Sequence, residues 1–320
     1  MPNSISDVGA DNAHVPVLCG PFVELLVQDV DGAYVDATFG RGGHARSLLE
    51  RLSAKGRLLA LDRDPEAVAA GLQLAKRDKR FCIVHKPFSH MDEALAEVGW
   101  EQVDGIGFDL GVSSPQLDQP ERGFSFQFSG PLDMRMDPSN DQPLSWRLQH
   151  TNEKELARVL REYGDERYAS RIARSILRAL GEGELVDTRA LENVCYHAVP
   201  RSGRHGRIHP ATRTFQALRM WVNEEVAEIE QGLAAAVRHL RAGGRMAVIS
   251  FHSGEDRLVR DAIDRQVNPC TCPSDFPMCI CGKRPTMKWV QKKPLRASEA
   301  EVNANPRARS ARMRVAERLA

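Results

Sequence analysis

Short apolar runs alternate with helical patterns from the start of the chain to Leu110. Apolar runs of a few residues, bounded by turn residues, predict buried strands, and apolar residues three or four apart predict amphipathic helices. Alternation of this kind is typical of an α/β fold with parallel strands joined by crossover helices. The predicted strands are 33–39, 57–61, 81–84 and 103–110, and the predicted helices are 44–53, 65–76 and 89–98.

The alternation stops after Leu110. A stretch punctuated by Gly and Pro continues to about Pro143, and helical patterns without strands then fill the chain up to a basic loop at 200–210. We therefore predict a Rossmann-like sheet domain, built from residues 1–134 and 213–320, that is interrupted by an inserted all-helical domain at 135–212.

The α/β pattern returns in the C-terminal third of the chain. Apolar residues from Leu218 to Leu240 step by three and four, which predicts one long helix that ends at Gly243-Gly244. A buried strand at 245–251 and a late strand at 312–317 follow.

Charge is unevenly distributed along the chain. The net charge is only +1, but from Lys283 to Ala320 eleven Lys and Arg oppose three Glu, a local excess of +8. A basic C-terminal tail on an acidic body suggests a polyanionic partner, although a solubilising surface would have the same composition. No apolar stretch approaches the roughly 20 residues that cross a bilayer, and no targeting pattern is visible, so a cytoplasmic protein without membrane contact is expected.

A glycine-rich turn follows the first predicted strand. It contains Gly40, Gly42, Gly43 and His44, and Asp62 ends the second strand. Such glycines allow a ligand to approach the backbone at a helix N-terminus, and the carboxylate can accept hydrogen bonds from a ribose. The same residues fit a nicotinamide dehydrogenase and an S-adenosylmethionine-dependent methyltransferase equally well.

Two later features favour the methyltransferase. Phe88, just after the third strand, is placed to contact an adenine ring, although a core phenylalanine fits the pattern as well. The fourth strand leads into Asp109-Leu-Gly-Val-Ser-Ser-Pro-Gln116 at the edge of the sheet where ligands bind. An acidic residue followed by a proline-containing turn at this point is typical of amino-methyltransferases.

Several longer segments resemble the bacterial 16S rRNA cytosine-N4 methyltransferase family, known as MraW or RsmH. They are found in order along nearly the whole chain. The segments are 39–44, 61–65, 109–116, 121–126, 131–137, 209–218, 250–257 and 305–310.

The resemblance implies S-adenosylmethionine as methyl donor and a cytosine N4 in the decoding region of 16S rRNA, within the small ribosomal subunit, as acceptor; no protein partner is evident. Carried over by position, it implies that the cofactor is bound by a set of seven residues. They are Gly42, Gly43 and His44 at the methionine end, Asp62 at the ribose, Phe88 and Asp109 beside the adenosine, and Gln116.

The chemistry requires acceptors for the hydrogens of the attacking amine. Asp109 and the hydroxyls of Ser113 and Ser114 are the candidate catalytic groups. The turn has no aromatic residue directly after Pro115, so stacking on the base is expected from Phe124, Phe126 or Phe251. For RNA binding, phosphate contacts are expected from Arg201, Arg204, Arg207 and Arg213.

Four cysteines lie close together, at Cys270, Cys272, Cys279 and Cys281. They make a candidate structural zinc site, but the Cys-x-Cys spacing is tighter than usual and favours ordinary or redox-labile thiols over zinc, so no metal is assigned. Cys19, Cys82 and Cys195 are expected to be isolated small apolar residues.

Other function classes stay open on the residues alone. A non-catalytic ribosome assembly factor would share the basic tail and the insertion. DNA or another RNA as substrate is excluded only by the resemblance.

Overall fold

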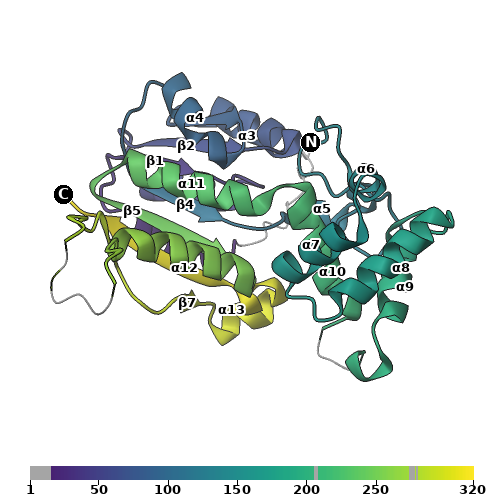
Figure 1. Cartoon of the computed structure of the whole chain (residues 1–320). Coiled ribbons are helices and arrows are strands. Elements are labelled where there is room, and N and C mark those ends of the chain that lie inside the picture. The colour runs from purple at the N-terminus through teal and green to yellow at the C-terminus, as the bar shows by residue number, and fades with distance from the viewer. Residues whose placement is uncertain (1–15, 205–207, 274–277, 279) are drawn as a thin grey trace, which may run out of the picture.

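The computed structural model describes residues 16–204, 208–273, 278 and 280–320. Its centre is a mostly parallel sheet in the order β3-β2-β1-β4-β5-β8-β6, with β7 paired to β8 (Figure 1). Strands β1 to β5 are parallel, and β8 runs antiparallel to both β5 and β6. The bounds are β1 Ala33–Asp36, β2 Arg57–Asp62, β3 Phe81–His85, β4 Val103–Asp109, β5 Leu240–Ser250, β6 Met287–Trp289, β7 Leu295–Arg296 and β8 Arg312–Arg318.

Helices cover both faces of this sheet. Buried residues of α4, α11 and α12 pack on one face, and buried residues of α1, α2 and α3 pack on the other. Their bounds are α1 Cys19–Leu26, α2 Gly43–Arg51, α3 Pro65–Arg77, α4 Met91–Glu97, α11 Glu225–His239 and α12 Ser253–Val267. The predicted α/β class is confirmed, because each of the six predicted strands has a counterpart; the short strands β6 and β7 were not predicted.

A second hydrophobic core lies among the helices between β4 and β5. It includes buried residues from Leu132 to Val222 and lies to the right of the sheet in Figure 1. An all-helical insertion is therefore present, while the proposed domain limits at 135 and 212 stay a prediction. The helices are α5 Ser114–Asp118, α6 Leu144–Gln149, α7 Glu153–Gly164, α8 Ala169–Gly181, α9 Thr188–Ala198 and α10 Pro210–Val222.

The single long helix expected from 218 to 240 is wrong. The chain forms α10 and α11, which are separated at Asn223 and Glu224, and Glu224 has a left-handed φ of 52°. The side chain of Asn223 accepts a hydrogen bond from Met136 N at 2.7 Å and donates one to Met134 O at 2.7 Å. These bonds to the segment that enters the helical block stabilise the break. Leu240 directly begins β5, so Gly243 and Gly244 lie within that strand rather than ending a helix.

The basic segment from Lys283 is folded into the sheet domain rather than forming a tail. It supplies β6, β7 and β8, together with the helix α13 Glu299–Ala304. Several of its cations pair with acids of the body; Arg314 is buried against Asp256 with an Nε–Oδ1 distance of 2.7 Å. Part of the local positive charge is therefore paired within the fold, because Arg307 contacts Asp118 and both Arg312 and Arg314 contact Asp256.

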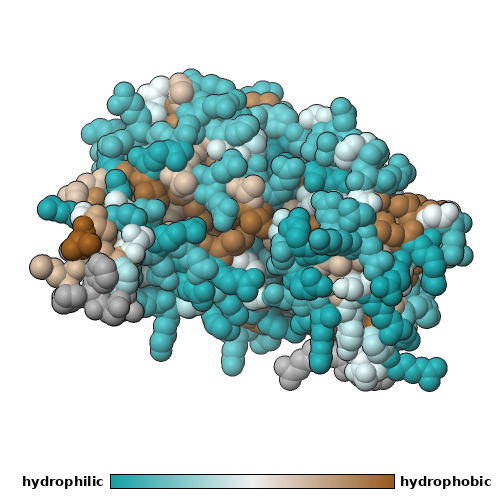
Figure 2. All heavy atoms as spheres, in the orientation of Figure 1, coloured by the Kyte–Doolittle hydropathy of each residue, from teal (hydrophilic) through white to brown (hydrophobic). Residues whose placement is uncertain are grey.

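The surface has no large apolar belt on the face that Figure 2 shows; hydrophilic side chains dominate it and hydrophobic ones occur in separate groups. Among the helices of the described part of the chain, none combines the length and apolar character that a bilayer crossing requires.

Candidate active site

Three aspartates end neighbouring parallel strands at one edge of the sheet. Asp36 ends β1, Asp62 ends β2 and Asp109 ends β4, and β1 lies between the other two strands. Ligands of doubly wound sheets bind at this edge. The sequence analysis does not predict Asp36 as a site residue, because it places Asp36 inside a strand that continues to residue 39, whereas β1 ends at Asp36.

The glycine loop turns tightly beside these carboxylates. Gly40 and Gly42 have positive φ angles of 55° and 71°, which other residues rarely adopt. A Cβ atom on Gly42 would lie 2.5 Å from the Phe39 ring. Gly40 N donates to Asp62 Oδ2 at 2.7 Å, so the loop is tied to the end of β2. The glycines therefore let the backbone reach the strand edge; their contact with a cofactor stays a prediction, as it does for Gly43.

His44 is buried in the first turn of α2, with only 5% of its surface exposed. Its Nε2 lies 3.5 Å from Asp109 Oδ2, and its ring packs 4.3 Å from that of Phe22. Burial alone would lower the pKa of His44, but the neighbouring Asp109 and Cys19 side chains and the negative charge of Asp36 raise it to about 10. At neutral pH His44 is thus an imidazolium that orients Asp109, a side-chain role that the glycine-loop motif does not indicate.

Cys19 belongs to the same cluster and is not the isolated apolar residue that was expected. Its Sγ lies 3.1 Å from Ser47 Oγ. Burial raises the pKa of this thiol, but hydrogen bonds with His44 and Ser47 outweigh burial and lower it.

Buried carboxylate oxygens at the strand edge lack hydrogen-bond partners. Among the described residues this holds for Asp36 Oδ2 and Asp109 Oδ1. Burial raises the pKa of Asp36 and that of Asp62 to about 6 each. Unpaired buried acceptors are rare in proteins and are a feature of ligand sites. The strand edge is therefore suited to a ligand that offers hydrogen-bond donors.

The turn after β4 is held on both sides. Asp109 N donates to Thr38 Oγ1 at 2.6 Å, and a Cβ atom on Gly40 would lie 4.0 Å from Ser113 Cβ. This turn therefore lies against the glycine loop. Gln116 is buried and already engaged: its Oε1 accepts from Ser113 N at 3.0 Å and its Nε2 donates to Asp64 Oδ2 at 2.8 Å. These bonds give Gln116 a positioning role beside its predicted place in the cofactor pocket.

Ser114 is contacted by an arginine from the far end of the chain. Arg307 Nη1 donates to Ser114 Oγ, and Arg307 Nη2 lies 2.8 Å from Asp118 Oδ1. Both acceptors lie on α5, a helix of only five residues, so Arg307 holds its register. No sequence signal indicated this contact.

We expect Arg307→Gln to lower kcat of the reaction at this site by about 3- to 10-fold, since a lost partly exposed charged pair costs about 1 kcal/mol. The affinity for the ligand bound at the strand ends should stay within about twofold, because Arg307 contacts α5. Arg309→Gln, an exposed neighbour, is the matched control, and steady-state kinetics with calorimetric binding would measure both quantities. An unchanged kcat would show that α5 keeps its position without Arg307.

The aromatic candidates are distributed over different parts of the fold. Phe126 packs in the helical block, 5.0 Å from the Phe215 ring, and Phe124 is buried. Phe251 is half-buried and adjoins the turn after β4, since a Cβ atom on Gly111 would lie 3.6 Å from its ring. Phe88 packs edge-on against Phe108 at 5.6 Å and is partly buried in the sheet core. Phe251 is thus a stacking candidate that adjoins this turn.

The four candidate RNA-binding arginines are not equivalent. Arg204 donates to Val199 O at 2.8 Å and lies over the Tyr196 ring, so it closes the end of α9. Arg213 is exposed and donates to Asp165 O at 3.3 Å, and Arg201 is exposed. Arg207 lies outside the described residues. Phosphate contact by any of them stays a prediction.

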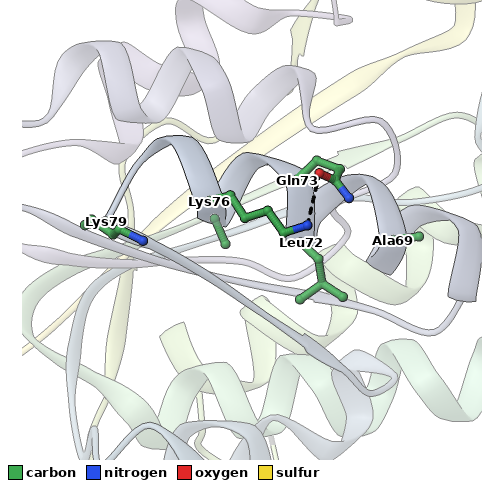
Figure 3. A pocket seen from close by; sticks show the side chains of 6 residues that line it. Ala69, Leu72, Gln73, Lys76 and Lys79 are labelled. Carbon is green, nitrogen blue, oxygen red and sulfur yellow. Dashed lines mark hydrogen bonds between the residues drawn. The ribbon is translucent and has the colours of Figure 1, made fainter.

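A hollow of about 410 Å³ lies elsewhere, along the outer side of α3. Figure 3 shows its lining residues, which include Leu72, Gln73, Lys76 and Lys79. Lys76 donates to Gln73 across it at 3.4 Å, and no carboxylate or nucleophile is among its lining residues. This hollow contains none of the predicted site residues and does not change the assignment of the site.

The direction of β8 separates the two enzyme classes that the glycine loop left open. A doubly wound dehydrogenase continues from its fifth strand with a parallel sixth strand, whereas here antiparallel β8 lies between β5 and β6. Together with the glycine loop and the acidic strand ends, this topology defines a class I methyltransferase, whose methyl donor is S-adenosylmethionine. The chain belongs to the MraW methylase family, whose model matches residues 11–319.

Relatives match along nearly the full length of the chain. Ribosomal RNA small subunit methyltransferase H of Heliobacterium modesticaldum is 46% identical over 308 residues, covering 96% of this chain and 98% of the relative. The protein of the same name from Geotalea uraniireducens is 47% identical over 311 residues, covering 97% and 100%. The resemblance inferred from the motifs is thereby confirmed.

Proposed function

We propose that this protein transfers a methyl group from S-adenosylmethionine to the exocyclic N4 amine of a cytosine in the decoding region of 16S rRNA. The relatives' names support small-subunit rRNA as the substrate. One observation favours an amine as the methyl acceptor. Asp109 lies beside the proline-containing turn, and its Oδ1 is buried without a hydrogen-bond partner among the described residues. A carboxylate oxygen without a partner is a strong acceptor for hydrogen bonds from an amino group.

The residues at the strand edge fit the cofactor. Asp62 would accept hydrogen bonds from the ribose hydroxyls. The backbone of Gly42, Gly43 and His44 would face the methionine end, since it forms the N-terminus of α2 after the positive-φ Gly42. Phe88, Asp109 and Gln116 complete the proposed pocket. When bound, S-adenosylmethionine supplies an activated methyl group on a sulfonium.

Catalysis then depends on orientation. Cytosine N4 is a poor nucleophile because its lone pair is delocalised into the ring, and fixing its direction can contribute on the order of 7–11 kcal/mol. Asp109 would accept a hydrogen bond from the amino group and so favour the rehybridised nitrogen. His44 would hold the carboxylate of Asp109 in place. Ser113, whose Cβ adjoins the glycine loop, would accept a hydrogen bond from the second amino hydrogen. The proton is lost from the methylated nitrogen, and water suffices as its acceptor.

The target base must leave its stack to reach Asp109, at a cost of a few kcal/mol. Phe251 offers a ring next to the turn on which the base can rest. Exposed Arg201 and Arg213 on the helical block would contact phosphates of the same RNA.

The deciding experiment is methyl transfer from labelled S-adenosylmethionine to small ribosomal subunits that lack the modification, followed by mass spectrometry of the nucleosides. We expect label on cytosine N4 and none on cytosines of a control DNA. Label at another atom, or no transfer to either subunits or free rRNA by protein that binds the cofactor, would contradict the proposal.

A further inference from the structure

The long loop between α12 and β6 contains three cysteines whose sulfur atoms converge. The Sγ atoms of Cys270, Cys272 and Cys281 all lie within 4.8 Å of one another, and those of Cys270 and Cys281 are 3.9 Å apart. Sulfurs that bind one tetrahedral zinc ion at about 2.3 Å lie about 3.8 Å from each other. A disulfide requires sulfurs about 2.05 Å apart, so the observed spacing fits shared coordination and not a bond.

A backbone hydrogen bond points in the same direction. Ile280 N lies 3.4 Å from Cys272 Sγ and donates to it. Sulfur accepts hydrogen bonds weakly as a thiol and more strongly as a thiolate, and ligands of metal centres are commonly held by such outer contacts. Because Ile280 directly precedes Cys281, the bond joins the two Cys-containing halves of the loop.

In the described part of the loop, two large apolar side chains face solvent and do not pack in a hydrophobic core: Met278 and Ile280 are each 73% exposed. The loop leaves and returns at one place, where Thr286 Oγ1 donates to Gln266 Oε1 at 2.7 Å. Long loops without regular structure are uncommon in compact domains, and a metal crosslink is one way to stabilise them.

We propose that Cys270, Cys272 and Cys281 bind a structural zinc ion. Thiolates are soft ligands that select zinc over magnesium or calcium. Cys279, the fourth cysteine of the sequence pattern, lies outside the described residues, and the proposal rests on the other three. The zinc site would stabilise the loop and the outermost strand β6, which follows the loop.

The zinc ion takes no part in methyl transfer. Helix α12 begins directly after β5, at the carboxyl ends of the parallel strands, where Asp109 lies. It then runs back along the sheet for 15 residues, about 22 Å. The C-terminal end of α12, from which the cysteine loop starts, therefore lies at the opposite end of the sheet, on the left in Figure 1. Metal binding and methyl transfer can accordingly be measured separately, and the proposal does not depend on the substrate.

Full-length protein from zinc-supplemented medium, purified without chelator, is expected to contain about one zinc ion per chain by mass spectrometry of the metal. The double variant Cys270→Ser/Cys281→Ser should contain less than about one tenth of that. Cys82→Ser changes a half-buried cysteine of β3 and is the matched control, with zinc retained.

A second measurement on the wild-type chain covers the case in which the variant does not fold. Cobalt exchanged into the protein should give the visible absorption of a tetrahedral thiolate site, and a mercurial reagent should release zinc as it modifies the thiols. Background zinc together with no cobalt spectrum, a Cys270–Cys281 disulfide in its place, or full zinc content in a folded double variant would overturn the proposal.

Discussion

Asp109→Ala is expected to lower the single-turnover rate of methyl transfer by at least about 100-fold even at saturating S-adenosylmethionine, where the loss of its proposed cofactor contact no longer limits the rate. Losing one preorganised group that stabilises a transition state costs about 10²- to 10³-fold. The side chain is fixed for this role, because the Asp109 backbone is tied to Thr38 and its Oδ2 lies beside His44. The rate would be measured with saturating S-adenosylmethionine and small ribosomal subunits.

Asp109→Asn separates orientation from charge. It keeps one acceptor oxygen but removes the negative charge that faces His44, so an intermediate rate is expected. Asp261→Ala, an exposed carboxylate of α12, controls for general effects, and thermal unfolding checks the fold of each variant. A wild-type rate in Asp109→Ala would remove this residue from the mechanism.

The strands of the sheet were predictable because each is a short apolar run that ends at a turn residue. The break between α10 and α11 was not, because the apolar spacing continues in phase across Asn223 and Glu224. The residue that stabilises the break bonds to Met134 and Met136, far away in sequence. Periodicity reports which face is buried, and it contains no information on a tertiary contact of this kind.

The candidate site likewise contains residues that the sequence could predict and residues that it could not. Asp62 and Asp109 could be found because strand ends in a parallel sheet meet at one edge. Arg307 and Ser114 form a hydrogen bond although they are 193 positions apart in the sequence. The buried ring of His44 interacts with the carboxylates of Asp109 and Asp36, which raise its pKa. Such roles depend on which side chains the fold brings together, and a local motif does not specify them.

Asp62→Ala is expected to weaken S-adenosylmethionine binding by about 10- to 100-fold in Kd. Hydrogen bonds to a charged group contribute about 1.5–3 kcal/mol, and each 1.4 kcal/mol is a factor of ten. The substitution also frees Gly40 N, which now donates to Asp62 at 2.7 Å, so the glycine loop loses its tie to β2. Isothermal titration calorimetry would give the Kd, and Asp62→Asn, which keeps an acceptor for Gly40, should lie between the two.

The pH dependence of the same binding gives an independent check. Burial raises the pKa of Asp62 to about 6 in the protein without ligand. Ribose hydroxyls donate to the charged carboxylate, so binding favours deprotonation and the affinity should fall as the pH decreases through 6. Asp36 has a similar pKa, and the loss that depends on Asp62 is therefore the part of the decline that disappears in Asp62→Ala. If the variant shows the same decline as the wild type, the ribose contact belongs to another residue.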